Sequence, residues 1–208
     1  MQIIEPLVPG EYYHIYNRGI NGENIFRETK NYSYFLKLYT KHIADIADTY
    51  CYCLLKNHFH ILVKIKEENI KTPAGHPVSN PEKYIVNELP GKKASKHFSN
   101  LFNAYAQGIN KTYKRTGGLF ETPFRRKLVN EDHYFTWLVW YIHSNAQRHK
   151  IVDDFRLWPH SSYHSILSNK PTNLKREELM VWFDDVDYFV KYHIGQKEDL
   201  DNLMIEFD

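Results

Sequence analysis

The stretch over 54–65, LLKNHFHILVKI, restricts what this chain can fold into more than any other part of the sequence. Its residues alternate with the two-residue period of a β-strand, so the stretch has two distinct faces. One face is apolar and suits burial, and the other carries both histidines: Phe59, Ile61, Val63 and Ile65 form the first, and His58, His60, Leu62 and Lys64 the second. Two imidazoles at positions i and i+2 lie roughly 6–7 Å apart along a strand and can converge on one cation. The pair alone fits equally well a strand face that happens to carry two histidines.

The segments around this strand predict an antiparallel sheet with helices. The link of Lys56 and Asn57 is so short that the histidine strand is expected to return antiparallel to the strand before it. Alternation and helical spacing predict the remaining elements: strands over 11–18, 50–55 and 123–129, a helix of about 15 residues capped by Asn31, a helix over 131–149 capped by Asn130, and helices over 95–115, 162–167 and 179–192. The resulting order, strand-helix-strand-strand-helix-strand, predicts an α+β domain.

Composition divides the chain into parts. Residues 66–94 contain four prolines and two glycines with little periodicity, which predicts a long loop inserted in the domain. Residues 177–208 hold ten acidic and two basic side chains, whereas residues 1–176 hold 25 basic and 15 acidic ones. We therefore expect a basic domain over 1–168 and an acidic helical extension over 169–208.

The overall composition excludes several classes of protein. A chain that is 42% hydrophobic and 25% charged is not a disordered chain, and no run approaches the ~20 apolar residues of a membrane span. The N-terminus lacks the pattern of a signal peptide, and the two cysteines, Cys51 and Cys53, lie on one face of a strand where they cannot easily bridge. We expect a cytoplasmic protein without a membrane partner. The basic domain and the 16 tyrosines and 12 phenylalanines of the chain favour nucleic-acid binding.

A second segment supplies polar groups that could complete a site with the histidines. A polar-aromatic stripe follows the helix over 131–149 at steps of three and four residues: Tyr134, Trp137, Tyr141, Asn145 and Arg148. Asparagine is disfavoured in the middle of a helix because its side chain competes for backbone hydrogen bonds. The position of Asn145 one turn after Tyr141 therefore needs an explanation beyond helix formation.

These segments resemble the single-tyrosine transposases with an HUH motif, the IS200-like group, and more closely the REP-associated tyrosine transposases. The resemblance covers about residues 11–167 and is carried by YHIYNRG, KNHFHILV, GGLFETPFRRK, YIHSNA and WPHSSY in this order. Two departures stand out. Ala146 replaces the usual proline after the asparagine, and Thr122-Pro123 replaces the usual Gly-Arg, a change that bears on DNA contact.

The resemblance implies a ferredoxin-like antiparallel sheet backed by helices, with the two histidines on a central strand. It assigns Tyr141 as the nucleophile, and we expect His58, His60 and the amide oxygen of Asn145 to bind one Mg²⁺ or Mn²⁺. The implied reaction is metal-dependent cleavage and rejoining of single-stranded or hairpin DNA through a 5′-phosphotyrosine bond. The residues that we expect to contact DNA are Arg18, Lys111, Lys114, Arg115, Arg125, Arg126 and Trp158.

Alternatives remain open at this point. Tyr105 is the second candidate for the nucleophile, and Trp158 suits a packing role as well as a DNA contact. A ferredoxin-like sheet can also bind nucleic acid without catalysis. A metal-dependent nuclease that uses water would cleave DNA without a covalent adduct. Both a monomer and a homodimer are compatible with the sequence.

Overall fold

The computed structural model describes residues 6–67 and 90–196. Four strands form one antiparallel sheet in the order β2-β3-β1-β4. The strands and the helices that precede and follow them are β1 (Tyr12–Arg18), α1 (Thr29–Ile43), β2 (Ala47–Leu54), β3 (His58–Ile65), α2 (Pro90–Tyr113), β4 (Arg125–Val129) and α3 (Asp132–Arg148). The predicted ferredoxin-like α+β fold, with the histidine strand in the middle of the sheet, is confirmed.

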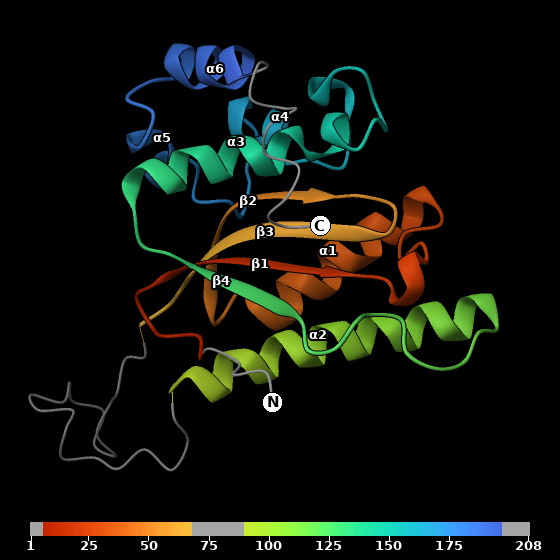
Figure 1. The fold of residues 1–208 in the computed structure, drawn as a ribbon. Helices are drawn as coiled ribbons and strands as arrows, with labels where there is room; N and C mark the ends of the chain where they lie inside the picture. The colour runs from red at the N-terminus through yellow and green to blue at the C-terminus, as the bar shows by residue number, and fades with distance from the viewer. Residues whose placement is uncertain (1–5, 68–89, 197–208) are drawn as a thin grey trace, which may run out of the picture.

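The sheet is covered on both faces (Figure 1). On one face, α1 and α2 bury an aromatic core in which Phe59 of β3 contacts Phe35 and Phe102. On the other face, α3 covers a second core that includes Leu62 of β3 and Ile142. Alternate residues of β3 therefore serve two different cores, so the strand that carries the histidines is held from both sides.

Short helices complete the second core on the outer side of α3 (Figure 1). They are α4 (Tyr163–Leu167), α5 (Arg176–Val181) and α6 (Val186–Gly195), and two 3-10 turns, η1 (Ile20–Gly22) and η3 (Phe155–Leu157), lie in the connections. Leu179, Phe183 and Phe189 of this C-terminal part are fully buried. Within the described residues, no helix is long and apolar enough to cross a bilayer.

The free edge of β2 is protected by chain segments from the C-terminal half. The amide of Ser162 donates to the carbonyl of Tyr52, and the amide of Lys175 donates to the carbonyl of Thr49, both at 2.9 Å. These bonds use groups that an open sheet edge would offer to another chain. They also fix the segment after α3 against the sheet.

Two predicted helix caps are wrong by one turn or less. Asn31 lies inside α1, where its side-chain oxygen accepts from the amides of Arg27 and Glu28 at 2.9 Å, and Glu28 is the cap. Glu28 at the cap and Asn31 three residues later form the two reciprocal hydrogen bonds of a capping box. In a typical capping box, Ser or Thr is the cap and Glu or Gln follows three residues later. Glu131 takes the place predicted for Asn130 before α3.

Other predicted boundaries also move. α2 begins at Pro90 rather than at Ser95, as a proline at the first helical position allows. The predicted loop over 66–94 is therefore shorter at its C-terminal end, and residues 68–89 lie outside the described part. The single helix predicted over 179–192 is two helices, because Asp184 adopts a positive φ of 60° and the side chain of Asp185 caps α6.

Candidate active site

The fold brings the predicted metal ligands of β3 and α3 together. Nε2 of His58 lies 3.3 Å from the side-chain oxygen of Asn145. The rings of His58 and His60 lie with their centroids 5.2 Å apart, and the ring of Tyr141 lies 5.4 Å from that of His60. Residues more than 80 positions apart in the chain thus form one cluster, because α3 crosses the sheet face toward which the histidines point.

The hydrogen bonds of the cluster leave acceptors that face one another. Nδ1 of His58 lies 2.8 Å from the side-chain oxygen of Asn57 and donates to it, since an amide oxygen only accepts. In neutral His58, Nε2 then carries a lone pair toward Asn145, whose oxygen is also an acceptor. Two acceptors at this distance repel, and either a proton on Nε2 of His58 or a metal cation beside the pair would remove the repulsion.

Burial supports the same interpretation. His60 is 1% exposed and Asn145 is fully buried, and Nε2 of His60 has no hydrogen-bond partner among the described residues. A buried ring nitrogen without a partner is costly, and a cation shared with His58 and Asn145 would satisfy it. Two imidazole nitrogens and an amide oxygen are suitable ligands for a divalent ion that prefers nitrogen and oxygen. In the described part of the chain, no three His, Cys, Asp or Glu side chains group around a possible metal position.

A third histidine, which the sequence analysis did not select, belongs to this cluster. His14 of β1 is fully buried, and its Nε2 lies 2.9 Å from Nδ1 of His60. Burial, with a smaller effect of Lys127, lowers the pKa of His14 to about 3. Burial, followed by the charge of His14, holds the pKa of His60 well below its usual value. Both rings are therefore neutral at pH 7, the form in which an imidazole binds a metal.

Tyr141 lies in the layer between the sheet and α3. Its side chain is 3% exposed, its ring stacks on Trp137 at 5.2 Å, and the guanidinium carbon of Arg148 lies 5.1 Å from the ring centroid. The ring meets His60 and His14 edge to face. The phenol ring is thus next to the proposed ligands and is held by Trp137 and Arg148 of its own helix.

A cavity of about 260 Å³ opens beside the two histidines of β3. Most of the residues that line it have basic or polar side chains: Tyr16, Arg18, His58, His60, Arg125 and His149 are among them. Tyr141 is not one of the lining residues. Such a wall suits an anionic group such as a phosphate, which would reach the histidines from this side.

Two of the wall residues, Tyr16 and His149, were missed by the sequence analysis. The sequence spacing relates both residues to others of the site. Tyr16 lies two residues after His14 on β1, and His149 follows Asn145 by one helical turn. The ring of His149 lies 4.6 Å from that of His58. Burial raises the pKa of the Tyr16 phenol, and Arg125 opposes this shift.

The predicted DNA-contact residues fall into separate places. Arg18 and Arg125 line the cavity and both pair with Glu121, at 2.6 and 3.2 Å. Arg126 points to the opposite face of β4, where its guanidinium carbon lies 3.9 Å from the centroid of Phe124. Burial lowers the pKa of Arg126 to about 10.

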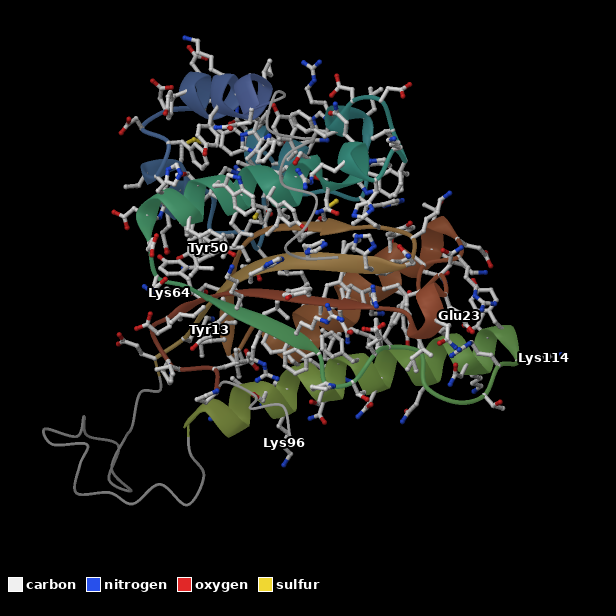
Figure 2. The ribbon with its side chains drawn as sticks, in the orientation of Figure 1. Tyr13, Glu23, Tyr50, Lys64, Lys96 and Lys114 are labelled. Carbon is white, nitrogen blue, oxygen red and sulfur yellow. The ribbon has the colours of Figure 1, made fainter. Side chains whose placement is uncertain are left out.

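The remaining basic candidates lie at the C-terminal end of α2. Lys111 and Lys114 are exposed there, and Lys114 is seen at the same end of the molecule as Glu23 (Figure 2). Arg115 pairs with Glu23 at 2.9 Å and with the side-chain oxygen of Asn110 at 2.6 Å. These contacts give Arg115 a structural role, whereas the two lysines remain accessible to an anionic partner.

Two aromatic candidates have local packing roles. The indole of Trp158 donates to the carbonyl of Leu54 at 2.9 Å, which favours packing over a DNA contact. The hydroxyl of Tyr105 donates to the carbonyl of Ile25 at 2.8 Å, and its side chain is fully buried. Tyr105 also belongs to the core between the sheet and α2, on the face away from His60. It is therefore not placed to act as the nucleophile.

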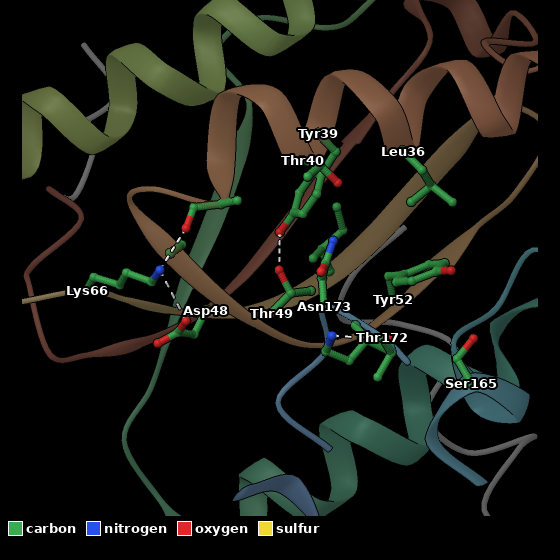
Figure 3. A pocket seen from close by; sticks show the side chains of 14 residues that line it. Leu36, Tyr39, Thr40, Asp48, Thr49, Tyr52, Lys66, Ser165, Thr172 and Asn173 are labelled. Carbon is green, nitrogen blue, oxygen red and sulfur yellow. Dashed lines mark hydrogen bonds and ion pairs between the residues drawn. The ribbon is translucent and has the colours of Figure 1, made fainter. Parts of the chain in front are cut away.

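A larger cavity of about 390 Å³ lies between α1 and the edge strand β2 (Figure 3). Its one lysine, Lys66, contacts Asp48 and the carbonyl of Ala44, and the hydroxyls of Tyr39 and Thr49 bond to each other. Among the described residues, its wall contains the carboxylate of Asp48 and no arginine or histidine, so it favours a phosphate less than the cavity beside the two histidines does.

The fold has a counterpart among solved structures. A REP-associated tyrosine transposase bound to a REP hairpin superposes with a TM-score of 0.60 and 13% sequence identity, over 82% of this chain and 88% of that one. A bacterial tRNA(His) guanylyltransferase-like protein in complex with ATP matches with a TM-score of only 0.33 and 12% identity, over 86% and 75% of the two chains. No family model matches the sequence, and no curated protein sequence matches it significantly. At this identity the first likeness establishes the fold.

Proposed function

We propose that this protein cleaves and rejoins single-stranded DNA through a covalent bond to Tyr141, with a divalent ion held by His58, His60 and Asn145. The observation that carries the proposal is the cluster of inward-facing acceptors, two imidazole nitrogens and an amide oxygen, directly beside a helix-borne tyrosine. The fold shared with a transposase that binds a DNA hairpin supports it.

The proposed reaction is an exchange of phosphate esters. The phenol oxygen of Tyr141 forms a bond to the scissile phosphorus, and the bond from phosphorus to the 3′ oxygen of the neighbouring nucleotide breaks. Overall, the phenol proton passes to the leaving 3′ oxygen, which becomes a 3′ hydroxyl. A bound Mg²⁺ or Mn²⁺ would act as a Lewis acid on the phosphate. The number of phosphate ester bonds is unchanged, so a 3′ hydroxyl can reverse the step without a nucleoside triphosphate.

The chain's own residues have defined tasks in this scheme. Arg18 and Arg125 would hold the DNA backbone at the mouth of the cavity, where Glu121 now pairs with both. Trp137 and Arg148 hold the phenol ring in position. A folded single strand suits the site better than a continuous duplex, because its unpaired backbone can enter a narrow cavity.

The test is incubation of the full chain with an end-labelled hairpin strand, with Mn²⁺ or with EDTA, followed by a denaturing protein gel. We expect a labelled protein band with Mn²⁺ and none with EDTA. Cleavage of the DNA without a labelled band would replace the proposal by a hydrolytic nuclease. Binding without either product would leave a non-catalytic nucleic-acid-binding module.

The two faces of β4 give a matched test of the DNA surface. We expect Arg125→Gln to weaken hairpin binding about tenfold and to reduce the slope of log K against log salt by about one, because one phosphate contact is lost. Arg126→Gln removes the same charge from the opposite face and should change the affinity less than threefold. Titrations at several salt concentrations measure both quantities. Equal effects of the two variants would contradict the proposed binding face.

A further inference from the structure

We infer that His14 is a positioning residue that fixes the tautomer of His60 so that His60 can bind the metal ion. The inference rests on the proposed function, because it concerns the same metal site. The structure contributes a bond between two fully buried imidazoles, Nε2 of His14 to Nδ1 of His60 at 2.9 Å.

A neutral imidazole has one protonated nitrogen and one nitrogen with a lone pair. In the bond between His14 and His60, only one ring can be the donor. If His14 donated, His60 would carry its proton on Nε2, directed into the cluster, and could not bind a cation there. If His60 donates from Nδ1, its Nε2 carries the lone pair that the site requires. An acceptor at His14 therefore selects the metal-binding tautomer of His60.

The neighbouring ligand is arranged in the same way. Nδ1 of His58 donates to the side-chain oxygen of Asn57 at 2.8 Å, which leaves its Nε2 as an acceptor. Metal-binding histidines almost always donate their second ring N–H to such a partner, which orients the ring and fixes the tautomer. His58 thus uses an amide oxygen for this purpose, and His60 uses the ring nitrogen of His14.

The surroundings of His14 keep its ring in position. The ring stacks on Tyr16 with centroids 4.6 Å apart and an interplanar angle of 22°. On the other neighbouring strand, Lys127 is the register partner of His14. A neutral ring held in this plane is a suitable acceptor for His60.

The experiment measures Mn²⁺ binding to the full chain by calorimetry, without DNA. We expect His14→Leu, which has no acceptor, to weaken Mn²⁺ binding by about 10–100-fold. His14→Gln, whose amide oxygen can accept from His60, should stay within about threefold of the wild type. Wild-type affinity in His14→Leu, or an equal loss in both variants, would overturn the inference.

The wild-type protein offers a second measurement that does not depend on a variant. Nitrogen NMR of 15N-histidine protein reports the protonated ring nitrogen directly, and we expect Nδ1–H for His60. A His60 ring protonated at Nε2 would overturn the inference even if His14→Leu did not fold.

The two proposals fail in different ways. Unchanged Mn²⁺ binding in His60→Ala would remove the metal site, and the role of His14 with it. Lost binding in His14→Leu together with a wild type that forms no DNA adduct would support the tautomer role and contradict strand transfer.

Discussion

Replacing Tyr141 with phenylalanine is expected to abolish the covalent DNA–protein adduct, a loss of at least about a thousandfold, because the attacking oxygen is removed. The affinity for the hairpin should stay within about twofold, since phenylalanine retains the ring that packs against Trp137 and His60. A denaturing gel measures the yield of the adduct, and a binding titration measures the affinity for the hairpin.

Tyr105 supplies the matched control for this substitution. It is also a buried tyrosine on a helix, but its hydroxyl bonds to the carbonyl of Ile25 in the opposite core. Tyr105→Phe should lower stability slightly and leave the adduct yield unchanged. An adduct that persists in Tyr141→Phe would remove Tyr141 from the role of nucleophile.

Lowering the pH from 7 to 5.5 is expected to remove several kcal/mol of stability, because each buried histidine that stays neutral in the folded chain contributes about 1 kcal/mol over this range. The pKa values of His14 and His193 are lowered to about 3, and those of His60 and His143 lie well below the usual value, chiefly through burial. As the pH falls, these histidines are protonated in the unfolded chain below about pH 6.5, whereas in the folded chain they are protonated only at a lower pH. Stability is therefore complete above pH 6.5 and is lost as the pH falls toward 3.

Two of these histidines belong to a buried chain of hydrogen bonds behind α3. Nδ1 of His193 donates to the carbonyl of Phe189 at 2.8 Å, so its Nε2 accepts from Nδ1 of His143 at 2.9 Å. Nε2 of His143 in turn accepts from the hydroxyl of Ser162 at 2.8 Å. Each group in this chain is satisfied only while both rings are neutral, which is why protonation opposes folding.

Denaturant unfolding in EDTA at several pH values measures the predicted effect. Below pH 6 the slope of stability against pH should approach that of four protons, about 5 kcal/mol per unit. His193→Gln keeps an acceptor for His143 but cannot be protonated, so it should reduce the slope by about 1.4 kcal/mol per unit. A wild-type slope of one proton or less would show that these rings are not buried and neutral.

Local patterns in the sequence were sufficient to predict most of the sheet. The alternation around His58 and His60 and the short link at 56–57 determine β2, β3 and their antiparallel pairing. Boundaries that depend on special backbone geometry were not predictable in the same way. The break between α5 and α6 depends on the positive φ of Asp184, and aspartate adopts this conformation in only a minority of cases.

Residues of the site could be predicted only where their spacing in the sequence places them on one face of a strand or helix. His58 and His60 share a strand face, and Tyr141 and Asn145 share a helix face, so each pair could be selected from the sequence. His14 and Tyr16 share a face of β1 in the same way, but their place beside His60 comes from the pairing of β1 with β3, which joins His14 and His60 across 46 positions. A histidine in a strand becomes informative only once its cross-strand neighbour is known.

The most direct test of the central claim is mass spectrometry of the wild-type protein after reaction with a hairpin strand and Mn²⁺. Nuclease treatment followed by proteolysis would leave a short nucleotide on the modified peptide. The proposal predicts a nucleotide attached through its 5′ phosphate to Tyr141. Cleaved DNA with an unmodified Tyr141, or a nucleotide on another tyrosine such as Tyr16, would contradict it.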